Sequence, residues 1–214
     1  MRIVREWLED FLSLELSDKA FKDVLEALNI PVKDIIYPEG EREKPAVPGS
    51  DAVFITDDEI TIAYEDLARL LSINNGFPCF IPEPFVKDKD FIFPEKVKRL
   101  CQNVLKNEGG GRGLLFSGAA ILLPDWLERR LSAGGFLYKN FADAVLLYVN
   151  AETGSDICVK KLSLRAFSPE SVAYLYVIKE NNDINSRALK RIRQLWEQHS
   201  TEFISCTYSA DSVF

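Results

Sequence analysis

The sequence has 214 residues, 47% of them hydrophobic and 28% charged, and a net charge of −7; these values indicate a soluble globular chain and argue against general electrostatic attraction to nucleic acid. No apolar run approaches the roughly 20 residues of a membrane helix, and the N-terminus lacks the apolar core of a signal peptide, so we expect an intracellular protein that does not bind membranes. The four cysteines are widely spaced, which favours buried thiols over a disulfide framework or a zinc site.

The first part of the chain is expected to be mainly helical. Residues 3–13 carry apolar side chains at helical spacing, and a second helix is expected from Ser17, a plausible N-cap, to just before Pro31. Residues 37–50 contain three prolines and two glycines, which predicts a loop. Residues 51–64 predict two short strands around a turn.

The middle and the end of the chain mix helices and strands. Residues 64–73 and 94–107 predict helices, and the glycine run that follows residue 107 is interpreted as a connector, because a phosphate-binding loop would follow a strand and precede a Lys-Ser or Lys-Thr pair. Four strand-like stretches and a closing helix follow. The fold class is therefore α/β (α+β), a single domain over residues 1–214 with a central mixed sheet flanked by helices. The strand-like stretches are 136–141, 143–151, 158–167 and 171–179, and the closing helix begins near residue 186.

The closing helix is unusually basic for an acidic chain. Arg187, Lys190, Arg191 and Arg193 lie within about two turns of it. These four residues are our candidates for contact with RNA or with an acidic partner. The alternative is an ordinary solvated helix face.

Three stretches together resemble a known family. "LLPDW" begins at Leu122, "DAVLLYVNAETGSDICVKKLSLRAFSPES" begins at Asp143, and "NDINSRALKRIRQLWEQHSTEF" begins at Asn182. Their order and lengths are similar to the Pro-Asp pair, the strand, turn and strand, and the acidic-then-basic helix in the N-terminal domain of the polymerase acidic protein of orthomyxoviruses, the influenza-like viruses. The N-terminal residues agree more loosely.

The resemblance implies a nuclease fold of the PD-(D/E)xK class. In that family the domain snatches caps from RNA, and two manganese or magnesium ions promote attack of water on a phosphodiester. Of the five positions that carry this chemistry, only the Pro124-Asp125 pair matches. The family's histidine, first glutamate, second carboxylate and lysine correspond here to Glu41, Phe93, Tyr138 and Thr153.

The mismatches imply a degenerate site, with Asp125 as a relic and with no catalytic residue, metal or other cofactor expected. Such a site is most similar to the thogotovirus branch (thogoto or Dhori type). The implied function is that of a non-catalytic domain of the acidic subunit of a heterotrimeric, RNA-dependent RNA polymerase. Its partners would be the catalytic and cap-binding subunits, with viral RNA as a possible ligand. Its location would be the host nucleus and the virion.

Two alternatives stay open at this stage. The first is an active manganese- or magnesium-dependent RNA endonuclease with rearranged ligands, and the second is a small-ligand sensor, because residues 118–137 also resemble a stretch of LysR-type effector domains. In the first alternative, Asp125 would act with Glu95, Asp143 or Glu152, and with Lys139 or Lys160.

Overall fold

The computed structural model divides into two compact units. Unit 1 comprises Met1–Pro82, Asp125–Leu137 and Ala151–Gly154, and unit 2 comprises Glu83–Pro124, Tyr138–Asn150 and Ser155–Phe214. The single domain predicted from the sequence is thus built as two units through which the chain passes repeatedly. The structure describes residues 1–37, 51–85, 95–109, 112–117, 122–163, 172–178, 182–199 and 204–209.

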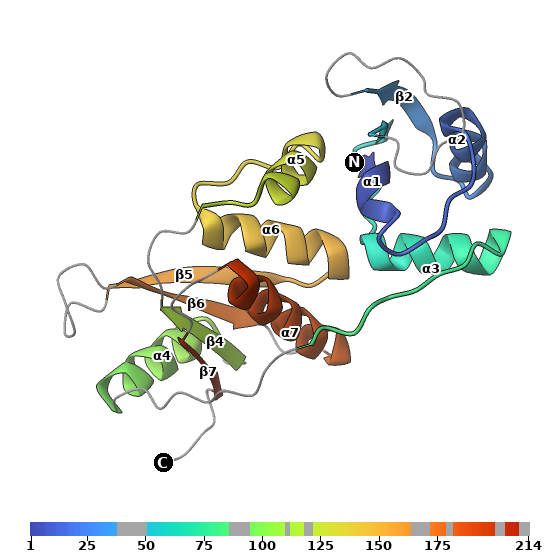
Figure 1. Cartoon of the computed structure of the whole chain (residues 1–214). Helices are drawn as coiled ribbons and strands as arrows, with labels where there is room; N and C mark the ends of the chain where they lie inside the picture. Colours follow the sequence, from blue (N-terminus) through green and yellow to red (C-terminus); the bar gives the residue numbers. More distant parts are fainter. Residues whose placement is uncertain are drawn as a thin grey trace. The chain divides into compact units, whose positions relative to one another are not determined.

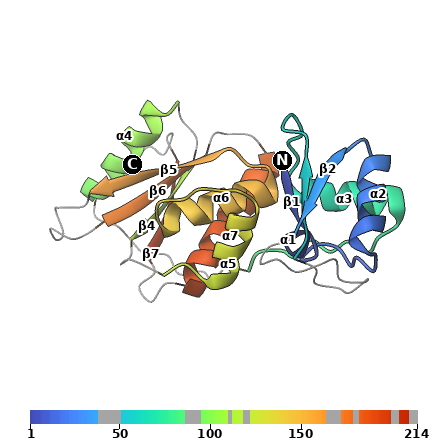
Figure 2. The same cartoon turned by 90° about the horizontal axis from the view of Figure 1, so that it is seen from above.

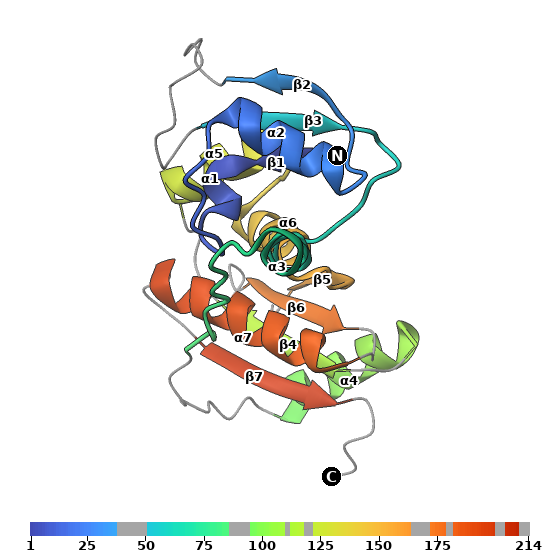
Figure 3. The same ribbon diagram turned by 90° about the vertical axis from the view of Figure 1, so that its right-hand side faces the viewer.

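Unit 1 is built around a three-stranded antiparallel sheet in the order β1-β3-β2 (Figures 1 and 3). The middle strand β3 buries Val53 and Phe54, and Phe54 meets Phe21 of α2 edge to face with ring centroids 5.1 Å apart. The elements are β1 (Arg2–Val4), α1 (Arg5–Leu8), α2 (Asp18–Ala27), β2 (Val32–Ile36), β3 (Val53–Thr56), α3 (Tyr64–Asn75) and α5 (Asp125–Ala133).

The prediction of a helix over residues 3–13 is wrong at its start. The chain begins as β1, and only Arg5–Leu8 form a helix. The reason is tertiary: Ile3 pairs with Phe54 of β3, and Met1 accepts a backbone hydrogen bond from Thr56. Apolar spacing alone cannot show a partner strand some fifty residues later in the sequence.

The outer edge of β1 is closed by a side chain rather than by a strand. The hydroxyl of Tyr64 accepts a hydrogen bond from the amide of Val4 at 2.9 Å and donates one to the carbonyl of Arg2 at 3.4 Å. Its ring stacks on Trp7 with centroids 4.2 Å apart. Both rings are buried, so the hydroxyl satisfies two backbone groups that would otherwise be costly to bury.

A buried arginine joins α1 to α2. The side chain of Arg5 is 1% exposed and forms ion pairs with Glu9 and Asp18, both at 2.7 Å. It also donates to the carbonyls of Leu14 and Leu16. The predicted cap of α2 is confirmed, because the Ser17 hydroxyl accepts a hydrogen bond from the third residue along.

Unit 2 contains a four-stranded antiparallel sheet in the order β5-β6-β4-β7, with helices on both faces (Figure 2). The α+β class is therefore confirmed, but the central mixed sheet is not: every described strand pairing is antiparallel. The elements are α4 (Glu95–Asn107), β4 (Arg112–Ser117), α6 (Phe141–Thr153), β5 (Ile157–Ser163), β6 (Val172–Ile178), α7 (Asn182–His199) and β7 (Ile204–Ser209). Asn150 is the last residue of α6 that belongs to unit 2.

The two faces of this sheet follow the alternation of its side chains. On one face, Leu115 of β4 and Leu175 of β6 pack in a core cluster with Cys101 and Leu105 of α4. On the other face, Phe116 of β4 stacks on Trp196 of α7 with centroids 4.7 Å apart. Tyr176 lies on that same face and donates its hydroxyl proton to the carbonyl of Ala142 in α6 at 3.0 Å.

Two of the four predicted strands beyond residue 135 are not strands. Residues 136–140 have no regular secondary structure, and residues 141–153 form the helix α6. The amide of Asp143 donates to the side-chain oxygen of Asn140, whose amide group in turn donates to the Asp143 carboxylate. This reciprocal N-terminal cap favours helix, and the buried Ala144, Val145 and Tyr148 follow at helical spacing. The later predicted strands are confirmed as β5 and β6.

Candidate functional site

The Pro-Asp pair lies at the start of a helix. Asp125 is the first residue of α5, is exposed to solvent and belongs to unit 1. A carboxylate in the first turn of a helix is favoured by the free backbone amides there, and this local role accounts for the residue type. Among the described residues, no group of three His, Cys, Asp or Glu side chains is placed to hold a metal ion.

Of the other positions implied by the resemblance, two belong to different units and two lie outside the described residues. Tyr138 belongs to unit 2, whereas Thr153 ends α6 in unit 1, where it is buried. Glu41 and Phe93 lie outside the described residues. The stretch expected to carry the second carboxylate, residues 136–141, is not a strand, and α6 replaces the next predicted strand, residues 143–151.

The rearranged ligand set is likewise divided between the units. Glu152 lies in unit 1 with Asp125 but is 2% exposed. Glu95 and Asp143 lie in unit 2, where Glu95 pairs with Lys98 and Arg99 on its own helix. Of the two candidate lysines, Lys160 is paired with Glu108 at 2.8 Å, an interaction that raises the pKa of the lysine, and Lys139 is exposed before α6.

The basic closing helix is the part of the predicted site that the structure places clearly. α7 lies on the unit 2 sheet through an apolar face, so its opposite flank is directed outward. Trp196 contacts Phe141 of α6 and Tyr176 of β6 in addition to Phe116. The buried residues of this apolar face are Ala188, Ile192, Leu195 and Trp196.

Three of the four predicted contact residues lie on one side of α7. Arg187, Lys190 and Arg191 are spaced three and four residues apart, which places them side by side on a helix; we call them the α7 basic face. Arg193 falls outside this face, and its side chain, 14% exposed, pairs with Glu197 at 3.4 Å. We therefore assign Arg193 a structural role.

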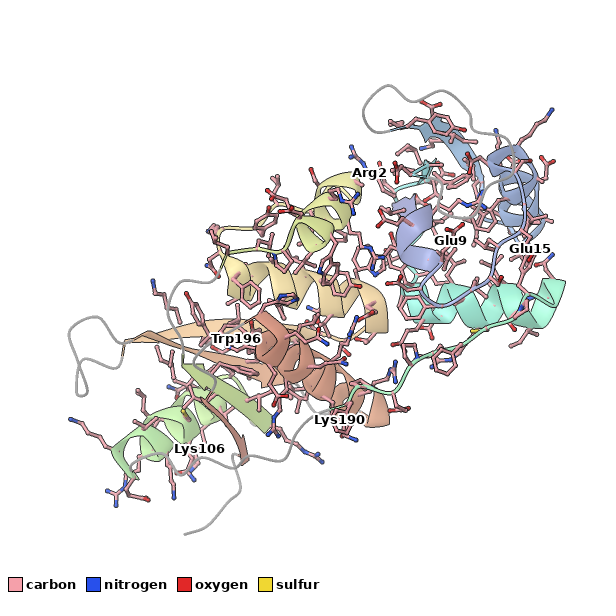
Figure 4. All side chains as sticks on the ribbon, viewed as in Figure 1. Arg2, Glu9, Glu15, Lys106, Lys190 and Trp196 are labelled. Carbon is pink, nitrogen blue, oxygen red and sulfur yellow. The ribbon has the colours of Figure 1, made fainter. Side chains whose placement is uncertain are left out.

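The three side chains of the α7 basic face differ in their contacts and exposure. Arg187 is 15% exposed at its side chain and pairs with Glu83 at 3.3 Å. Arg191 donates to the side chain of Gln194 at 2.8 Å and lies over the ring of Tyr148. Lys190 is exposed and makes no ion pair with another described residue. Lys190 is thus the cation most available to a ligand (Figure 4).

Sequence reasoning missed a second feature, in unit 1. Arg2 of β1 and Arg129 of α5 line a pocket of about 470 Å³. The two arginines are far apart in the sequence, and Arg2 directly precedes the segment, residues 3–13, that the sequence pattern assigns to a helix. No local pattern could have brought them together.

Neither protein-family models nor curated proteins match this sequence. Among the described residues, no helix is both long and apolar enough to cross a membrane.

Proposed function

We propose that the chain works as a binding domain rather than as a nuclease, and that the α7 basic face contacts RNA. The setting follows the resemblance: the N-terminal domain of the acidic subunit of a heterotrimeric viral RNA polymerase, with a PD-(D/E)xK-like ancestry. In this setting the domain also packs against the catalytic and cap-binding subunits. The resemblance rests on the Pro124-Asp125 pair and on residues 157–199, since residues 141–153 are helical.

The single observation that carries the proposal is the disposition of cations on α7. Lys190 is exposed between Arg187, which is 15% exposed and pairs with Glu83, and Arg191, whose guanidinium lies over the ring of Tyr148. An arginine side chain that is already held by such contacts loses little further freedom when a phosphate binds. A row of three cations on one helix face follows a phosphate backbone without reading bases.

The charge geometry fixes the expected salt dependence. For single-stranded nucleic acid, each phosphate contact adds about 0.7 to the slope of log affinity against log salt, so three contacts give a slope of about 2 and a loss of roughly 20-fold between about 50 and 200 mM salt. The net charge of −7 opposes binding at long range, so binding should be detectable mainly at low salt.

The test is fluorescence anisotropy of a labelled single-stranded RNA of mixed sequence. Lys190→Glu is expected to weaken binding at low salt and to lower the slope by about 0.7, one phosphate contact. The matched control is Lys96→Glu, which makes the same charge change at an exposed position on α4 of the same unit. Equal affinities for the two variants, or RNA binding that does not depend on salt, would contradict the proposal.

A thermal melt with manganese separates this proposal from an active nuclease. If manganese is present at about 100 times its dissociation constant, binding adds about 2.7 kcal/mol to the free energy of unfolding. For a chain of this size, that gain raises the melting temperature by roughly 5–10 °C. We expect the melts with and without manganese to coincide. A rise that disappears in Asp125→Ala would establish the nuclease and overturn the non-catalytic part of the proposal.

A further inference from the structure

A pocket in unit 1 combines an apolar wall with two guanidinium groups. It has a volume of about 470 Å³ and lies where β1 and β3 meet α5. Val4 and Val53 are neighbouring strand residues in register, and Ile36 of β2, 44% exposed, extends the same wall. The other lining residues are Arg2, Glu6, Asp51, Glu128, Arg129, Ser132 and Ala133.

The side chain of Arg2 is positioned by packing and not by an acidic partner. Gly135, just after α5, has a φ of +76°, and a Cβ at this position would stand 3.2 Å from Nε of Arg2 and 3.3 Å from its Cζ. The close contact therefore depends on glycine. Arg2 makes no side-chain ion pair or hydrogen bond with another described residue, although carboxylates line the same pocket.

The turn that holds Gly135 is itself well fixed. The amide of Phe136 donates to the carbonyl of Leu131, and the amide of Gly135 donates to that of Ser132. This pair of bonds is the Schellman arrangement that ends a helix with a left-handed residue. The surface under Arg2 is thus set by backbone hydrogen bonds, and the guanidinium lies against it.

The second guanidinium is only loosely engaged. Arg129 is 63% exposed at its side chain, and its contact with Glu6 is 3.7 Å long. The same carboxylate oxygen of Glu6 lies 3.8 Å from Nε of Arg130. Glu6 is therefore shared between two arginines, which leaves Arg129 with donors for an additional acceptor.

We infer that this pocket binds a small amphipathic carboxylate, with its head between Arg2 and Arg129 and its apolar part against Val4, Val53 and Ile36. Guanidinium groups bind carboxylates through paired, charge-assisted hydrogen bonds. A head with a single charge is favoured over a phosphate dianion, because Glu6, Asp51 and Glu128 line the same pocket and would repel the extra charge.

The test compares octanoate with octanamide, which has the same shape and no charge, by isothermal titration calorimetry of the whole chain. Octanoate is expected to bind about 10-fold more tightly than octanamide, the order of one charge-assisted interaction. Arg2→Gln and Arg129→Gln, both at exposed positions, should each reduce that difference and leave octanamide unchanged. Ile36→Ser should weaken both ligands.

The control is Arg69→Gln, which removes an exposed arginine of α3 in the same unit, away from the pocket. It should leave both affinities at the wild-type value, and thermal melts establish that each variant is folded. Equal binding of octanoate and octanamide, no binding of octanoate at millimolar concentration, or an equal loss in Arg69→Gln would overturn the inference. Tighter binding of octyl phosphate than of octanoate would overturn the assignment of the head group.

Discussion

Removing one hydroxyl group should destabilise unit 1, because the hydroxyl of Tyr64 takes the place of a neighbouring strand at the edge of β1. In Tyr64→Phe the ring can remain stacked on Trp7, so the change isolates the polar contacts. The amide of Val4, a residue 2% exposed, loses its partner at 2.9 Å. A buried backbone donor without a partner costs about 1–3 kcal/mol, whereas the longer bond to the carbonyl of Arg2 adds little.

We therefore expect a loss of about 2 kcal/mol, which at a urea dependence of about 2 kcal/mol per molar moves the unfolding midpoint down by roughly 1 M. The assay is urea unfolding followed by tryptophan fluorescence, to which Trp7, stacked on residue 64, contributes. Tyr174→Phe is the matched control, because the side-chain hydroxyl of Tyr174 makes no hydrogen bond to another described residue. A midpoint for Tyr64→Phe within about 0.2 M of that for the control would refute the edge-closing role, since the corresponding energy is below about 0.5 kcal/mol.

Three further predictions concern pH, a buried ion pair and a helix cap. Burial raises the pKa of Tyr64 and of Tyr176 well above the usual 10.0; the unfolded chain therefore loses these protons first, and stability should fall above about pH 10 by about 1.4 kcal/mol per pH unit for each residue. Urea midpoints measured against pH should show that decline, and Tyr64→Phe should remove the part of the decline that comes from Tyr64. A midpoint that stays constant up to about pH 12 would exclude this pH dependence. Arg5→Met should lower stability by about 3–5 kcal/mol, because Asp18, 1% exposed, would keep a buried charge without its cation. The double variant Arg5→Met, Asp18→Leu should regain much of that stability in urea unfolding. If it regains none, the loss does not come from an uncompensated charge. Asn140→Ala should cost about 1 kcal/mol through loss of the α6 cap, whereas Asn140→Asp should cost less; equal losses in denaturation would show that the side-chain oxygen is not what matters.

Local signals predicted the elements that form from their own residues. The Ser17 cap and the apolar spacing after it predicted α2, and the pattern around Trp196 predicted α7. Tertiary pairing decided the rest: β1 exists because β3 reaches it. α6 was missed because its residues are apolar on nearly every side, which hides the helical period, although the Asn140 cap was readable in the sequence.

The candidate site was predictable in position but not in detail. The cluster of cations on α7 could be read from the sequence, whereas the burial of Arg193 beside Glu197 depends on how the helix rotates onto the sheet. The pocket beside Arg2 joins the first strand to residues more than a hundred positions later. Contacts of that range have no local signature.

The way the chain alternates between its two units has a consequence for synthesis on the ribosome. The backbone crosses from one unit to the other between residues 82 and 83, 124 and 125, 137 and 138, 150 and 151, and 154 and 155. Helix α5 supplies two fully buried leucines to unit 1, Leu127 and Leu131. Residues 1–82 of unit 1 therefore leave the exit tunnel before α5 has been synthesised, and unit 1 can complete its core only after the later residues emerge. During that interval its uncovered apolar surface is a natural target for chaperones, and premature release of the nascent chain would leave an incomplete first unit.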